Sequence, residues 1–182
     1  EALLQQEAAD AIRTMARAQG YTERTVFVVA GAHFDWGEVL AAGGSMSLFA
    51  DKQIVEIRIP SGKPGKEGAV ALQQIAENAA QQDGVLTLVV LPRLDKASKS
   101  TAWFSALENN GASIQIDPIE RAALPAWIAQ RLQAQGQKVL GGEAGQQALQ
   151  FFADLVEGNL LAAHQEIQKL ALLYPEGELS FE

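Results

Sequence analysis

The chain has 182 residues, of which 48% are hydrophobic, so it can bury a core in one domain or in two small ones. Fourteen Lys and Arg against 22 Asp and Glu give a net charge of −8, which argues against a domain that grips nucleic acid by itself and favours a protein partner. The absence of cysteine excludes disulfide frameworks and thiolate metal sites, and no apolar run approaches the ~20 residues of a membrane span, so we expect a cytoplasmic protein.

Residues 1–117 alternate between helical and strand patterns. The chain opens on an amphipathic helix over 2–19 that Gly20 ends. The apolar stripe of this helix is expected to comprise Leu3, Leu4, Ala8, Ala11, Ile12 and Met15. Strands are predicted at 25–29, 54–59, 85–91 and 113–116. Helices are predicted between them at 34–42, 67–82 and 101–108.

This alternating order predicts an α/β fold with a parallel sheet sandwiched by helices. The continuous apolar run 25–29 is typical of a strand covered on both faces, and 85–91, the most apolar strand, is expected to lie centrally. Asp35 is expected to cap the helix that begins at Trp36. Trp36, Trp103 and Trp127 fall at helical positions beside other apolar residues, so we expect them in the core.

The pattern changes after Pro118. Residues 120–135, 143–157 and 159–174 predict three helices, with no strand signal between them. We therefore expect two domains, an α/β domain over 1–117 and a small helical domain over 118–182.

The sequence offers no catalytic constellation and predicts no cofactor or metal site. Gly62-Lys63 and Gly65-Lys66 lack the spacing and the following Ser or Thr of a phosphate-binding loop. No pair of acids follows the strand 54–59, and Asp95, between Arg93 and Lys96, favours a loop ion pair. The two histidines have no neighbour at metal-ligand spacing; we expect His33 in a turn, and His164 either on a helix surface or lightly packed.

Adjacent large apolar residues in a Gly/Ser-rich turn need an explanation, and Leu48-Phe49 follows Gly43-Gly44-Ser45. One interpretation is that the pair folds back and caps the core. The other is that it projects outward as an apolar plug for a pocket on a partner protein, as interface hot spots do.

Six short motifs occur in order across nearly the whole chain. They are Leu3-Leu4-x-Gln6-Glu7, Met46-Ser47-Leu48-Phe49-Ala50, Ala102-Trp103-Phe104 followed by Ala106-Leu107, Leu124-Pro125-x-Trp127-Ile128, Glu157-Gly158-Asn159-Leu160-Leu161-Ala162 and Leu172-Leu173-Tyr174-Pro175. Together they resemble the delta subunit of the bacterial DNA polymerase III clamp loader. The resemblance implies an AAA+-like module followed by its helical lid, in a fragment that lacks the first strand and the carboxy-terminal domain.

The resemblance also implies a function without ATP hydrolysis. The delta subunit binds the ring-shaped sliding clamp, the beta subunit, and holds one interface open for loading onto primed DNA. It assembles with other loader subunits through the carboxy-terminal domain that this chain lacks, and the parent belongs to the DNA polymerase III holoenzyme, a DNA-directed DNA polymerase.

The clamp-binding element of the family maps onto Met46, Ser47, Leu48 and Phe49, with Leu48 and Phe49 as the plug. Gly44 stands where clamp-binding peptides often carry a Gln, which puts the polar part of the contact in doubt. The lid motif at 158–162 also lacks the nucleotide-sensing arginine of active AAA+ lids.

Two alternatives stay open: an ATP-hydrolysing loader subunit whose phosphate loop lies outside this sequence, and an α/β adaptor unrelated to replication. We expect DNA contact through Arg93–Lys99 only within the assembled loader, because a fragment with a charge of −8 has little affinity of its own.

Overall fold

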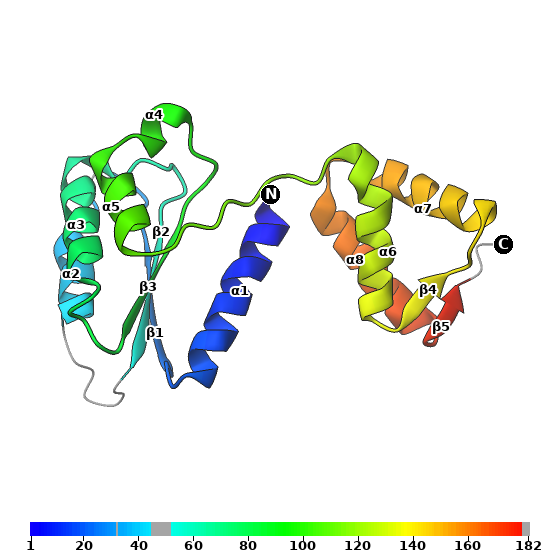
Figure 1. Cartoon of the computed structure of the whole chain (residues 1–182), viewed down its shortest axis with the longest axis horizontal. Coiled ribbons are helices and arrows are strands. Elements are labelled where there is room, and N and C mark those ends of the chain that lie inside the picture. The colour runs from blue at the N-terminus through cyan, green and yellow to red at the C-terminus, as the bar shows by residue number, and fades with distance from the viewer. Residues whose placement is uncertain (32, 45–51, 180–182) are drawn as a thin grey trace. The chain divides into compact units, whose positions relative to one another are not determined.

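The computed structural model describes residues 1–31, 33–44 and 52–179 (Figure 1). By its internal contacts the chain divides into two compact units. One comprises Gln6–Gln115, and the other begins at Ile116 and includes Glu1–Gln5. The division into independent domains 1–117 and 118–182 stays a prediction.

The first unit is a parallel three-stranded sheet between helices. Its elements are α1 (Ala2–Ala18, whose first turn belongs to the other unit), β1 (Glu23–Val28), α2 (Trp36–Gly44), β2 (Gln53–Arg58), α3 (Gly65–Asn78), β3 (Val85–Val90), α4 (Lys96–Lys99) and α5 (Ala102–Asn110). The strand order is β1-β2-β3, with α1 on one face and α2, α3 and α5 on the other (Figure 1). The predicted α/β class and parallel sheet are confirmed.

Three expectations about the strands are wrong. The central strand is β2, which is buried along nearly its whole length, whereas β3 is an edge of the described sheet and every residue in it is half-buried. The prediction that β1 is covered on both faces also fails, because Val26 and Val28 are 40% and 48% exposed. Residues 113–116, predicted as a fourth strand, pair with no strand among the described residues.

The core of this unit lies between the sheet and the face formed by α2, α3 and α5. Val55, Ile57 and Ile59 are buried there, together with the rings of Trp36 and Trp103. The predicted core positions of these tryptophans are confirmed, and Trp127 is buried in the other unit.

The second unit is helical. Its elements are η1 (Arg121–Ala123), α6 (Leu124–Ala134), β4 (Gln137–Val139), α7 (Glu143–Val156), α8 (Leu160–Leu173) and β5 (Gly177–Leu179). The three predicted helices are confirmed, but the short parallel pair β4–β5 was not predicted. Gln137 connects this pair to α8, because its buried side chain donates to the carbonyl oxygens of Leu170 and Tyr174 (3.0 Å each) at the end of that helix.

A buried carboxylate joins α1 to the sheet. Glu56, on β2, is fully buried, and its oxygens accept hydrogen bonds from Arg13 of α1 (3.0 Å), Arg24 of β1 (2.9 Å) and Arg58 (2.7 Å). Arg13 also pairs with Asp10. The predicted stripe of α1 is wrong at Ala11 and at Met15, which is 65% exposed, and the buried side of the helix includes the charged residue Arg13.

The arginines determine the charge state of Glu56. Burial by itself would raise the pKa of its carboxyl group, but the hydrogen bond from Arg58 and the charges of Arg13 and Arg24 outweigh burial and lower that pKa below its ordinary value of 4.5. A carboxylate with a lowered pKa stabilises the fold above its unfolded-state pKa, and this contribution is lost as the pH falls through its folded-state pKa.

We predict that Glu56→Gln lowers the free energy of unfolding at pH 7 by about 3 kcal/mol, because removing one member of a buried ionic cluster leaves its partners uncompensated. Urea denaturation from pH 7 into acid measures the effect. The difference in the free energy of unfolding between the variant and the unmodified chain should narrow below pH 4.5, the ordinary pKa of the carboxyl group. Glu77→Gln, at an exposed position on α3, is the control. A difference that stays constant with pH would contradict this role for the carboxylate.

A glycine sets the distance between α2 and α3. A Cβ at Gly68 would lie 2.5 Å and 2.6 Å from ring atoms Cζ2 and Cε2 of Trp36, and 2.8 Å from Cβ of Pro64. The Trp36 ring is buried and cannot move freely. Only glycine therefore allows α3 to approach the first turn of α2 this closely.

We predict that Gly68→Ala lowers the free energy of unfolding by about 1–3 kcal/mol through overpacking, despite the higher helix propensity of alanine. Gly44→Ala is the matched control, since Gly44 is also helical and a Cβ there meets no atom within 4 Å among the described residues. Urea denaturation of both variants checks the prediction. Equal stability of the two variants would show that the contact with Trp36 does not limit the distance between α2 and α3.

Candidate functional site

The predicted clamp-binding residues Met46, Ser47, Leu48 and Phe49 lie outside the described residues. The structure describes both flanks of this segment. Gly44 is the last residue of α2, and Lys52 precedes β2. Both flanks lie at the amino-terminal edge of the parallel sheet, where α2 ends and β2 begins (Figure 1).

Side-chain contacts hold the two flanks in place. The amide nitrogen Nε2 of Gln53 donates to the carbonyl oxygen of Ala42 (2.8 Å), which ties the last turn of α2 to the first residue of β2. Gln53 is buried, so this bond is sheltered from water. Lys52 Nζ donates to the carbonyl oxygen of Gln19 (3.1 Å) and lies 5.3 Å from the ring centre of Tyr21. The two ends of the segment 45–51 are therefore fixed relative to each other and to the end of α1.

The amino-terminal end of α2 is fixed as well. Asp35 accepts a hydrogen bond from the backbone N–H of Gly37 (2.8 Å), so the predicted N-cap is confirmed. The rings of Phe34 and Trp36 meet edge to face with centroids 5.1 Å apart, and Val39 one turn later is almost fully buried. The helix before the candidate segment is thus held at both ends.

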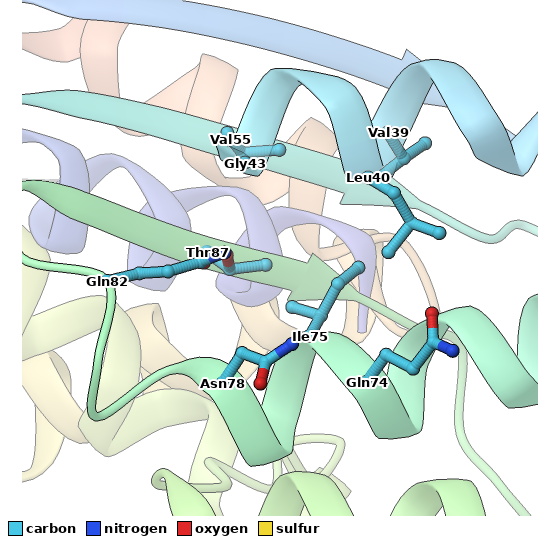
Figure 2. Close-up of a pocket in the computed structure, with 9 residues that line it drawn as sticks. All are labelled: Val39, Leu40, Gly43, Val55, Gln74, Ile75, Asn78, Gln82 and Thr87. Atoms are coloured by element: carbon cyan, nitrogen blue, oxygen red, sulfur yellow. The ribbon is translucent and has the colours of Figure 1, made fainter. Parts of the chain in front are cut away.

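A pocket of about 220 Å³ lies beside the same edge, between α2, α3 and the strands β2 and β3 (Figure 2). Its lining combines aliphatic side chains with three amides and a hydroxyl, from Val39, Leu40, Gly43, Val55, Gln74, Ile75, Asn78, Gln82 and Thr87. This lining carries no titratable group, so it has the character of a binding surface and not of an acid–base centre.

The other residues considered from the sequence do not converge on a reaction centre. His33 is exposed, and His164 is half-buried on α8. Within the ranges that the structure describes, no three His, Asp or Glu side chains lie close enough to share a metal ion. At the lid motif, Asn159 caps α8 by accepting from the backbone N–H of Ala162 (3.0 Å).

Asp95 differs from its prediction. Its carboxylate accepts from the backbone N–H of Ser98 (2.7 Å) and caps the short helix α4, and this hydrogen bond is the main reason why the pKa of Asp95 is lowered. The expected loop ion pair is therefore replaced by a helix cap. The hydrogen bond between Gln53 and Ala42 was not predicted, because no local sequence pattern indicates a bond between residues 11 positions apart.

No helix among the described residues has the length and apolar character required to cross a bilayer.

Comparison with known proteins gives a consistent result. A family model described as "DNA polymerase III, delta subunit" matches residues 1–117. The DNA polymerase III subunit delta of Escherichia coli (strain K12) is 35% identical over 178 residues, which cover 98% of this chain and 50% of that protein. The protein of the same description from Haemophilus influenzae (strain ATCC 51907 / DSM 11121 / KW20 / Rd) is 30% identical over 187 residues, 98% of this chain and 50% of its own.

Among solved structures, the Bacillus subtilis DNA clamp loader delta protein matches with a TM-score of 0.65 at 15% identity, covering 96% of this chain and 53% of that one. This likeness shows the fold, which is AAA+-like as the sequence predicted. The chain spans about half the length of the curated relatives it matches. The alternative of an adaptor unrelated to replication is wrong, because the chain belongs to the DNA polymerase III delta subunit family.

Proposed function

We propose that this chain is the clamp-binding part of a clamp-loader delta subunit and that it holds open the ring of a sliding clamp during loading onto primed DNA. The observation that carries the proposal is the 35% identity, over 98% of the chain, to a delta subunit of DNA polymerase III. The printed description of the B. subtilis relative, a DNA clamp loader delta protein, supports the same role. As a replication subunit, the protein is proposed to act in the cytoplasm.

In this proposal Leu48 and Phe49 are the apolar anchors, and Met46 and Ser47 support them. Burying Leu48 and Phe49 in a pocket of the clamp would contribute roughly 1.5–3 kcal/mol each. The fixed flanks favour this use of the segment, because an anchor tied to a rigid body loses less conformational entropy on binding than one on a free tail.

Binding alone does not open a ring. A ligand shifts an equilibrium only by the difference between its affinities for the two states. The rigid α/β unit supplies that difference in our proposal: the anchors attach to the clamp, and α2, held by its cap and by the contact of Trp36 with α3, presents a surface that fits the open interface better than the closed one.

The curated relatives extend beyond the segment that this chain matches, by about half of their length. We propose that the contacts with the other loader subunits lie in that region. An ATP-hydrolysing loader subunit stays the alternative. ATP binding by the full-length parent would support that alternative.

We predict that the double substitution Leu48→Ala with Phe49→Ala leaves the fold intact and weakens clamp binding at least about 100-fold, since losing ~3 kcal/mol of apolar burial corresponds to that factor. Surface plasmon resonance with purified clamp measures the affinity, and urea denaturation measures the stability. Leu172→Ala with Leu173→Ala, at an adjacent pair that is 87% and 73% exposed on the other unit, is the matched control.

Undiminished clamp binding by the Leu48/Phe49 variant would remove the proposed anchors. Unfolding of the same variant would show instead that the pair belongs to the core.

A further inference from the structure

The carboxyl-terminal end of α5 carries an exposed Asn-Gly dipeptide, Asn110-Gly111. Asn110 is the last residue of the helix, and Gly111 departs from helical geometry, with φ −151° and ψ −149°. The chain has four asparagines, and Asn110 is the only one that precedes a glycine. At this helix end a side-chain amide therefore lies next to a backbone nitrogen whose own residue has no Cβ to shield it.

The backbone N–H of Gly111 is not engaged by the helix. It donates to no carbonyl oxygen among the residues that the structure describes. By contrast, the N–H groups that follow α3 and α8, those of Ala79 and Tyr174, donate to carbonyl oxygens of the preceding turn (3.3 and 3.0 Å). Because the N–H of Gly111 is also exposed, it can lose its proton to water without first breaking a hydrogen bond. The nitrogen of Gly111 can therefore act as a nucleophile.

The side chain of Asn110 is held by one exposed hydrogen bond. Its Nδ2 donates to the carbonyl oxygen of Ala106 in the last turn of α5 (2.9 Å). Helix ends fray, so this turn opens more readily than the body of the helix. Opening the turn releases the side chain and lets Cγ of Asn110 approach the nitrogen of Gly111. The hydrogen bond slows an attack on Cγ but does not prevent it.

We infer that Asn110 is a site of spontaneous deamidation. The deprotonated backbone nitrogen of Gly111 forms a bond to Cγ of Asn110, and the bond from Cγ to Nδ2 breaks. Nδ2 takes a proton from water and leaves as ammonia. A second water opens the resulting five-membered succinimide at either carbonyl, which gives aspartate or isoaspartate. The net reaction consumes one water and releases one ammonia, and it does not depend on clamp binding.

The remaining asparagines serve as internal controls, because each precedes a residue with a Cβ: they are Asn78, Asn109 and Asn159. The nitrogen that follows Asn78 belongs to Ala79, whose N–H is already bonded to the carbonyl oxygen of Ala76 (3.3 Å). Asn159 is engaged as the cap of α8, where its Oδ1 accepts from the N–H of Ala162 (3.0 Å). We therefore expect these three positions to react much more slowly.

The product places a negative charge at the unfavourable end of a helix. The carboxyl-terminal end of a helix carries a partial negative charge, so a carboxylate there is destabilising. Deamidation takes the net charge from −8 to −9, and Glu108 already places one acid in the same turn. Since α5 contributes the buried ring of Trp103 to the core, we expect the modified chain to unfold at a lower urea concentration.

Peptide mapping by mass spectrometry during incubation of the chain tests the site. Deamidation replaces an NH group by oxygen, and a protein isoaspartate methyltransferase detects the isoaspartate. We expect Asn110 to react at least about tenfold faster than Asn109, with a rate that rises with pH because the nitrogen of Gly111 must lose its proton. Equal rates at the two positions, or no conversion at Asn110, would overturn the inference.

Two glycine variants test the role of the nucleophile. Gly111→Ala should slow conversion of Asn110 by at least about tenfold, since a Cβ crowds the approach to Cγ. Gly141→Ala is the matched control, because Gly141 is exposed and a Cβ there meets no described atom within 4 Å, and it should leave the rate unchanged. An unchanged rate in Gly111→Ala would contradict the mechanism.

A comparison with the unfolded chain tests the contribution of the fold independently of any substitution. The free N–H of Gly111 and the exposed last turn of α5 predict that native Asn110 reacts within about 100-fold of its rate in urea. A larger ratio would show that α5 protects Asn110, and the inference would then be wrong for the native protein.

Discussion

The α/β unit depends on a carboxylate that is taken out of water at the centre of its sheet. Burying an unpaired charge costs several kcal/mol, so Glu56 is tolerable on β2 only while guanidinium groups surround it. One of those groups comes from α1, one from β1 and one from β2 itself. Apolar contact is not directional, but these hydrogen bonds are, and they therefore specify where α1 lies on the sheet.

Local patterns located the longer helices and the three strands of the α/β unit, but they missed the short elements α4, β4 and β5 and did not indicate which strands are neighbours. Helical periodicity located the helices, and apolar runs located the strands β1, β2 and β3. The apolar character of a strand reports how its two faces are covered, but not whether another strand pairs with its edge, so 85–91 was placed centrally although β3 is an edge. The same limit explains 113–116, where a strand-like composition has no partner strand in the described part of the chain.

The prediction for α1 failed for a related reason. The predicted apolar stripe includes Met15 and not Arg13, because a charged residue is normally expected on the solvent-exposed side of a helix. Arg13 is buried instead, and the acid that compensates it, Glu56, is 43 positions away in the sequence. Periodicity carries no information about such a pair, and the position of Arg13 follows only once the parallel register of the sheet is known.

The candidate site shows the same division between local and non-local information. The Leu48-Phe49 pair stands out in the sequence because two large apolar side chains follow a Gly/Ser-rich stretch. The hydrogen bond from Gln53 to Ala42, which ties the flanks of that segment together, is not indicated by any local sequence pattern.

Rigidity is what connects these features to the proposed function. An apolar anchor on a loosely attached loop would bind open and closed clamps equally, and would therefore leave the ring closed. Every contact that fixes α2 and the start of β2, including the Asp35 cap and the Gly68–Trp36 approach, limits how far the body can adapt to the closed form. In the proposed function, the free-energy cost of that misfit would be what is available for opening the ring.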